Sequence, residues 1–94
     1  MYARLVRFIL KKEISQQVEK TLSDLVKAIK QQKGCKGATF FSDDADGASG
    51  LFVLWDTQAN ADAAAEVISP QLTRCLAGNT QGTVERRLFP VLQS

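Results

Sequence analysis

The chemistry open to this chain is limited first by an absence, because its 94 residues contain no histidine. Nucleophile systems that pair Ser or Cys with His are therefore excluded, as are the usual His-containing zinc sites. Cys35 and Cys75 form no CxxC pair, and the sequence GCKG at 34–37 follows a predicted helix instead of opening one. Neither a metal-ligand set nor a phosphate-binding loop is indicated, and we expect no cofactor.

Aromatic and arginine side chains on predicted strands are the remaining candidates for a binding site. In a layered fold, a crevice can open between a sheet and its helices, lined by the strand residues that point inward. An arginine in such a crevice favours an anionic or phenolate-like ligand. The predicted ligand contacts are Trp55, Arg4, Arg86, Tyr2 and Phe40.

A purely structural interpretation of the same residues stands beside this one. Aromatic side chains on strands commonly belong to the core, so Trp55 is either a core residue or the floor of a pocket. Strand arginines commonly pair with carboxylates, and Glu85 is the obvious partner. The sequence leaves open which arginine would line a pocket.

Four strands are predicted from apolar, β-branched and aromatic runs. The first is apolar on both of its alternating faces, which requires cover on both sides. The polar loop between the second and third strands spaces Ser42, Asp44 and Asp46 like a calcium loop, but Val53 stands where the bidentate Glu belongs, so a solvated turn is predicted. Pro90 cannot donate to a ladder, which places the last strand at an edge or ends it there. The predicted strands are 2–10, 36–42, 50–56 and 80–89.

Two helices are predicted between these strands. Apolar residues from Ile14 to Ile29 recur at spacings of three and four, with Ser15 as N-cap and Gly34 as a left-handed C-cap. The second helix begins near Thr57 and turns Ala61, Ala64, Ala65 and Ile68 inward. Ser69-Pro70 predicts a joint in that helix, followed by a short second piece that ends at Gly78.

The element order β-α-β-β-α-β predicts one α+β domain over residues 1–94, a ferredoxin-like antiparallel sheet with both helices on one face. The other face would be bare and apolar. A patch of that kind is most simply covered by a second copy about a two-fold axis, so we expect a homodimer.

Charge and composition exclude several other partners. The net charge is +2, and the lysines between Lys11 and Lys36 alternate with acidic residues as on a solvated helix face, so nucleic acid is not expected. No segment is apolar for long enough to span a membrane, and no signal peptide is recognised, so a cytoplasmic location is predicted. Cys35 and Cys75 are expected to lie toward the same end of the domain as free thiols.

The strand ending VLWD at 53–56, the alanine-rich segment that follows and the SPQL sequence at 69–72 together resemble antibiotic biosynthesis monooxygenase (ABM) domains of the dimeric α+β barrel group. The resemblance covers nearly the whole chain and implies a dimer. Trp55 matches the tryptophan that such domains carry at the end of the third strand. The chain departs from them in having no Asn in LFVL at 51–54 and no His in the following helix, and without a histidine ligand haem degradation is disfavoured.

The resemblance implies a cofactor-independent monooxygenase acting on a small aromatic substrate of quinol or phenol type. The substrate anion would be stabilised by Arg4 or Arg86 and its ring stacked on Trp55. A base would have to be Asp56, Glu66, Tyr2 or the acidity of the substrate itself. The alternatives are a non-catalytic module that binds a small molecule and a structural dimeric barrel whose pocket is packed shut.

Overall fold

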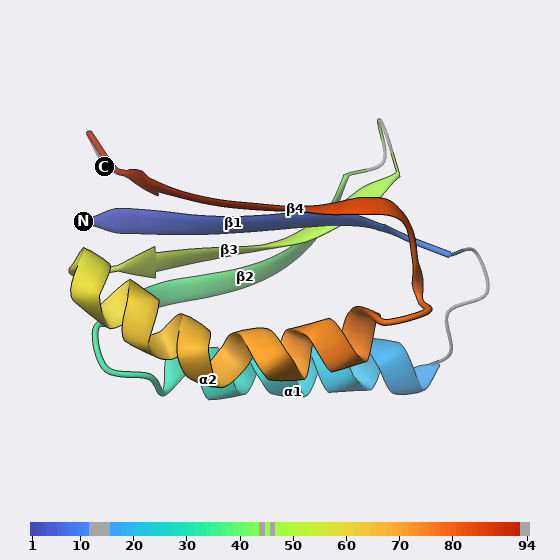
Figure 1. The fold of residues 1–94 in the computed structure, drawn as a ribbon, viewed down its shortest axis with the longest axis horizontal. Coiled ribbons are helices and arrows are strands. Elements are labelled where there is room, and N and C mark those ends of the chain that lie inside the picture. The colour runs from blue at the N-terminus through green and yellow to red at the C-terminus, as the bar shows by residue number, and fades with distance from the viewer. Residues whose placement is uncertain (12–15, 44, 46, 93–94) are drawn as a thin grey trace.

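The computed structural model describes residues 1–11, 16–43, 45 and 47–92 of the chain. The elements follow one another in the predicted β-α-β-β-α-β order (Figure 1). They are β1 (Tyr2–Leu10), α1 (Gln16–Lys30), β2 (Cys35–Asp43), β3 (Ala48–Trp55), α2 (Gln58–Leu76) and β4 (Thr80–Pro90). The predicted positions Ile14, Ser15, Asp44 and Asp46 lie outside the described residues.

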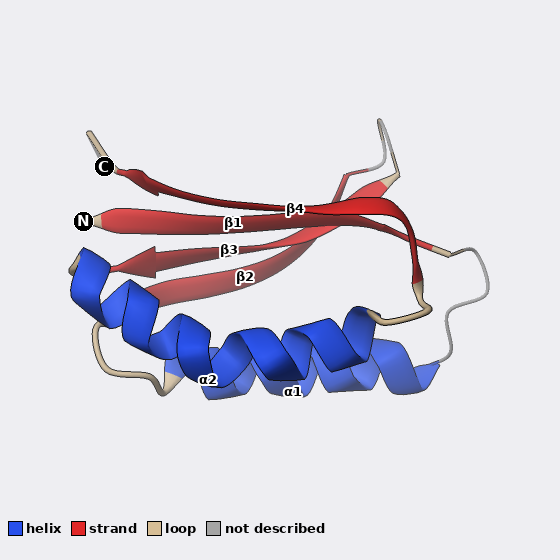
Figure 2. Cartoon of the chain, viewed as in Figure 1, coloured by secondary structure: helices blue, strands red, loops and turns tan. Residues whose placement is uncertain are grey.

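The four strands form one antiparallel sheet in the order β2-β3-β1-β4. Both helices lie on the same side of this sheet, and no described element lies on the other side (Figure 2). The predicted ferredoxin-like α+β architecture is therefore confirmed. Neither α1 nor α2 combines the length and the apolar character that a membrane-spanning helix needs.

Strand register assigns each side chain to a face of the sheet. Arg4 pairs with Val53 and Leu88, and Val6 pairs with Leu51 and Arg86, so these residues share the face that carries the helices. The core fills this layer, with Val6, Phe8, Leu51 and Val53 buried against the apolar faces of α1 and α2. Leu5, Phe52 and Leu54 alternate with them and project from the helix-free face.

The chain ends meet at one edge of the molecule. β4 is an edge strand that terminates at Pro90, as predicted. Just beyond it, the backbone N–H of Val91 donates to the carbonyl oxygen of Met1 at 2.9 Å. Met1 and Val91 therefore lie side by side at the same end of the sheet, where the ends of β1 and β4 meet (Figure 1).

Helix α2 begins where the sequence predicts, because the Thr57 hydroxyl accepts a hydrogen bond from the backbone N–H of Asn60 at 3.1 Å. The predicted joint at Ser69-Pro70 is wrong: Pro70 lies inside one helix that runs to Leu76. Proline removes one hydrogen bond from a helix and bends it, and α2 does bend along its length in Figure 1. Ile68, Leu72 and Leu76 continue one buried stripe across the proline, and this packing holds the two halves together.

The placement of the two cysteines also corrects the prediction. Cys35 opens β2 beside Trp55, at the end of the sheet where α2 begins, whereas Cys75 lies in the last turn of α2. A helix of 19 residues is about 28 Å long at 1.5 Å per residue, so the two thiols lie at opposite ends of the domain. Both are free cysteines.

Gly34 takes the left-handed backbone that the sequence predicts, with φ of 84° in the turn between α1 and β2. Its carbonyl oxygen accepts from the backbone N–H of Asp56 at 2.9 Å. A Cβ at this position would collide with the carboxylate of Asp56 and lie 2.5 Å from the Asn60 amide nitrogen. Gly34 thus lets the α1–β2 turn approach the start of α2 closely.

Candidate functional site

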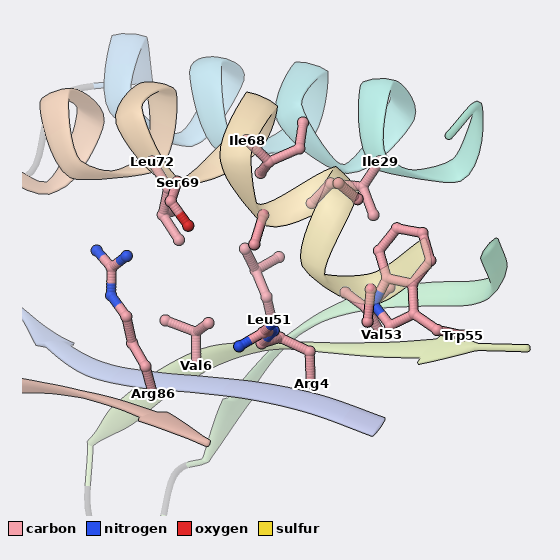
Figure 3. Close-up of a pocket in the computed structure, with 13 residues that line it drawn as sticks. Arg4, Val6, Ile29, Leu51, Val53, Trp55, Ile68, Ser69, Leu72 and Arg86 are labelled. Atoms are coloured by element: carbon pink, nitrogen blue, oxygen red, sulfur yellow. The ribbon is translucent and has the colours of Figure 1, made fainter. Parts of the chain in front are cut away.

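A cavity of about 60 Å³ lies between the helix-bearing face of the sheet and helix α2 (Figure 3). Most of its wall is apolar and includes Ile29 of α1 and a run of small residues along α2. Its only charged lining residues, within the part of the chain that the structure describes, are Arg4 and Arg86. The complete lining is Arg4, Val6, Ile29, Leu51, Val53, Trp55, Ala61, Ala64, Ala65, Ile68, Ser69, Leu72 and Arg86.

Trp55 forms the wall at one end of this cavity. It is the last residue of β3, and the chain turns directly into α2 through Asp56 and the Thr57 cap. This tight connection brings the first turns of α2 over the indole ring, which is only 3% exposed. Both interpretations of Trp55 hold together: it is a core residue, and one side of its ring borders the cavity (Figure 3).

Arg4 crosses the floor of the cavity from the central strand β1. Its Nη2 lies 3.6 Å from Oδ1 of Asp62 on α2, and its side chain is 25% exposed against 60% for Asp62. Asp62 does not line the cavity. The ion pair therefore sits at the rim, where solvent weakens it, while the inner part of the Arg4 side chain faces the cavity.

Arg86 stands at the other end, on the edge strand β4. It rises from the strand toward α2, with its guanidinium group beside Ser69 and Leu72 (Figure 3). Its Nη2 donates a hydrogen bond of 3.0 Å to Oγ1 of Thr73. Glu85, the predicted partner of the strand arginines, instead lies 3.6 Å from Nε of Arg87. In the described structure Arg86 is thus held by a neutral hydroxyl.

Tyr2 and Phe40 are not among the residues that line the cavity. Tyr2 pairs with Trp55 and Phe40 with Leu51, so both project on the helix side, but at positions outside the cavity. Phe40 is 37% exposed and packs its ring against Phe8, with 6.5 Å between the centroids. Of the five predicted contacts, the structure brings Trp55, Arg4 and Arg86 together around the cavity.

The sequence interpretation missed Ser69 and Thr73, the polar residues of α2 nearest Arg86. Ser69 was predicted to lie at a joint in the helix, and within a continuous α2 it borders the cavity instead. The spacing of residues 69, 72 and 73 could have identified Ser69 and Thr73 as neighbours on the cavity side of one helix, because helical residues three and four positions apart share a face.

No protein-family model matches the chain, and no curated protein shows significant similarity to it. Solved structures do match. An antibiotic biosynthesis monooxygenase has a TM-score of 0.83 at 18% identity, over 99% of this chain and 100% of the other. SnoaB, a cofactor-independent oxygenase from Streptomyces nogalater, has a TM-score of 0.77 at 19% identity, over 99% and 94%. A protein of unknown function from Nitrosomonas europaea has a TM-score of 0.80 at 15% identity, over 99% and 90%.

The chain has an ABM-like fold. At identities below 20%, this likeness concerns the backbone alone, and any chemistry depends on the residues that this chain places in the cavity.

None of the three candidate bases, Asp56, Glu66 and Tyr2, lines the cavity of this ABM-like domain. Asp56 is exposed, and its carboxylate accepts a hydrogen bond of 2.9 Å from the Asn60 side chain, which holds its pKa below the usual 3.8. Such a carboxylate is a weak base. Glu66 is exposed on α2, and neither it nor Tyr2 lines the cavity. No group of acidic, Cys or His side chains suited to a metal ion occurs among the described residues.

Proposed function

We propose that this chain is a cofactor-independent monooxygenase that acts on a small aromatic substrate of phenol or quinol type, as a cytoplasmic homodimer of one ABM-like domain per chain. The observation that carries the proposal is the cavity bordered by Trp55 at one end and by Arg4 and Arg86 across its floor and far end. Aromatic and cationic walls suit a flat ring that bears negative charge. The fold shared with SnoaB, a cofactor-independent oxygenase, supports the reaction type.

In the proposed reaction, the substrate supplies all the electrons. A phenolate gives one electron to dioxygen, and the resulting superoxide and phenoxyl radical combine at the para carbon. The hydroperoxide formed there loses water to leave the quinone, so phenol and dioxygen become para-quinone and water. The chain contributes orientation of the ring against Trp55 and stabilisation of the phenolate by guanidinium groups.

The volume of the cavity sets a condition on this proposal. An apolar cavity that holds benzene has a volume of about 150 Å³, against about 60 Å³ here. A ring therefore enters only if a side chain moves. Arg86 is suited to move, because it is long, exposed, and held to Thr73 by one hydrogen bond.

Oxygen uptake with a panel of quinols and anthrones tests the activity. Ala65→Leu on α2 would fill the cavity, so we expect it to abolish uptake. Ala63→Leu is the matched control, because Ala63 is exposed on the same helix and does not line the cavity. No uptake by the native protein across the panel, or equal uptake by the two variants, would contradict the proposal.

The dimer is proposed from the helix-free face of the sheet. Large apolar side chains lie there in adjacent register positions, since Leu5 pairs with Phe52, and Ala3 pairs with both Leu54 and Phe89. These large side chains are only partly covered by their neighbours, and Phe89 is 38% exposed. A second copy of the same face would bury them all, which an isolated chain cannot do.

Light scattering coupled to gel filtration tests the dimer. Leu54→Asp would place a charge on the helix-free face, in the same register row as Ala3 and Phe89, and we expect it to give monomers where the native chain gives dimers. Val67→Asp is the control, because Val67 is a large exposed apolar residue on α2, away from that face. A native chain that stays monomeric at micromolar concentration would refute the dimer.

A second candidate, a module that binds an aromatic ligand without turnover, is favoured by the lack of a proton acceptor among the cavity's lining residues in the described structure. It predicts that a ligand quenches the fluorescence of Trp55, the only tryptophan in the chain, and raises the melting temperature. Binding without oxygen uptake would select this candidate over the oxygenase.

A further inference from the structure

The lining of the cavity contains positive charge and no described group that can take up a proton. The guanidinium groups of Arg4 and Arg86 only donate hydrogen bonds and cannot act as bases. The remaining lining residues are apolar except for Ser69, whose hydroxyl is a poor base. A neutral phenol that entered this cavity would therefore meet two guanidinium groups and nothing to remove its proton.

We propose that the cavity binds its aromatic ligand as a preformed anion, so that it selects phenols or enols that are already ionised at the working pH. Arg86 is the residue that makes this selection. The inference rests on the proposed binding site and narrows its substrate class, but it concerns binding and does not require turnover.

Arg86 is assigned this role, and not Arg4, because the two arginines differ in their partners. Arg4 has a carboxylate partner, Asp62, at 3.6 Å. Arg86 donates to the neutral hydroxyl of Thr73. If Arg86 exchanged the Thr73 hydroxyl for a phenolate, its neutral acceptor would be replaced by a charged one. Hydrogen bonds that involve charged groups are roughly twice as strong as those between neutral groups. For Arg4 the same exchange would only replace one anion with another.

The groups that surround Arg86 support this assignment from every neighbouring element. Val6 lies opposite it on β1, and Arg4 lies two register positions along on the same face. Helix α2 presents Ser69 and Thr73 near its guanidinium group. The cavity residues of β3 are apolar or aromatic.

Two carboxylates on α2 complete the surroundings of the cavity. They are Asp62, paired with Arg4, and Glu66, which is exposed and forms no ion pair with any described residue. A neutral compound of the same shape, measured at the same pH values, therefore separates the ionisation of the ligand from any change in the protein.

Equilibrium dialysis with three ring compounds tests the inference. The probes are 4-nitrophenol, which ionises near neutral pH, phenol, with a pKa of about 10 like that of a tyrosine side chain, and 4-nitroanisole as the neutral shape control. We expect the affinity for 4-nitrophenol to rise through its own pKa. Phenol is expected to stay weak until about pH 10, and 4-nitroanisole to stay weak at every pH.

Variants of Arg86 and Arg74 test which residue makes the cavity select anions. Arg86→Gln should weaken the binding of 4-nitrophenolate roughly tenfold, the change expected for one hydrogen bond between charged groups. Arg74→Gln removes the same charge from an exposed site next to Thr73, outside the cavity, and should change affinity by less than about twofold. Arg86→Lys, which keeps the charge, should recover part of the loss.

Three results would overturn the inference: 4-nitroanisole bound as tightly as the phenolate, Arg86→Gln equal to Arg74→Gln, or no 4-nitrophenolate bound at millimolar concentration. Its failure is separable from that of the proposed function. If the protein binds anions selectively but takes up no oxygen with the quinol and anthrone panel, the proposed oxygenase activity is refuted and the inference on anion binding stands. If it takes up oxygen but binds the neutral ether tightly, the inference on anion binding is refuted and the oxygenase activity stands.

Discussion

Gly50 is the position at which one added methyl group tests the packing of the central strands. It lies on β3 between Arg7 of β1 and Phe41 of β2. A Cβ built there would lie 2.5 Å from the carbonyl oxygen of Val6 and 2.5 Å from Cζ of Phe41. Ordinary van der Waals contact begins near 3.4 Å, so each neighbour would have to withdraw by 3.4 − 2.5 = 0.9 Å.

The two neighbours differ in how easily they can move. The ring of Phe41 can rotate away on the partly exposed face of an edge strand, but the Val6 carbonyl belongs to β1, which is paired on both sides. Insertion of a methyl group into packed structure costs about 1–3 kcal/mol. We expect Gly50→Ala to lower the free energy of unfolding by about 2–3 kcal/mol, because one of its two collisions is with backbone.

Urea denaturation followed by circular dichroism measures this change, at one fixed protein concentration because the stability of the proposed dimer would depend on concentration. With a slope of about 1.5 kcal/mol per molar urea, the midpoint should fall by roughly 1.3–2 M. Gly37→Ala is the matched control, since it makes the same change on β2, where a Cβ meets nothing within 4 Å. Its free energy of unfolding should stay within about 0.5 kcal/mol of the native value.

Equal midpoints for Gly50→Ala and Gly37→Ala would refute this account of the packing. The double variant Phe41→Leu, Gly50→Ala separates the two collisions, and most of the penalty should remain in the Phe41→Leu background. If the penalty disappears there, the ring of Phe41 and not the Val6 carbonyl is the obstacle.

Three further predictions concern α2 and its ends. Pro70→Ala should raise the free energy of unfolding by about 1–2 kcal/mol in urea melts, because alanine restores a helical hydrogen bond; no gain would mean that the bend itself is needed for packing. The Asn60 hydrogen bond lowers the folded-state pKa of Asp56 below 3.8, so the stability from this carboxylate is full above about pH 4 and lost as the pH falls through that lower value. Asp56→Asn should flatten the acid limb of stability against pH relative to the native chain, and an unchanged limb would contradict the shift. Burial raises the pKa of the Cys75 thiol, so maleimide labelling near neutral pH should modify Cys35 first, with two thiols titrating after denaturation.

The fold could be predicted because its signals are local and periodic. The apolar runs at 2–10 and 50–56, the Thr57 cap and the edge position before Pro90 each have one physical cause, and each corresponds to a feature of the structure. The break at Pro70 was mispredicted because propensity describes one residue, whereas the stripe Ile68, Leu72 and Leu76 continues across it. Buried apolar contact outweighed the lost hydrogen bond.

The site was predictable only in part, for a geometric reason. Alternation tells which residues of one strand share a face, and strand register shows that Arg4, Arg86 and Trp55 lie on the helix side together with Tyr2 and Phe40. It does not tell where along the sheet the helix stands away from the strands and leaves a space. That position depends on how α2 bends and packs, so only three of the five residues line the cavity.

The meeting of the chain ends has a consequence for how this molecule folds. β1 and β4 pair along their length although almost the whole sequence separates them, so their ladder closes one long loop and raises the contact order. A circular permutant with residues 94 and 1 joined by a short linker, and with new ends opened beside Gly78, would turn that pairing into a hairpin. The same set of native contacts would then form from nearby segments, and refolding should be faster with little change in the final structure.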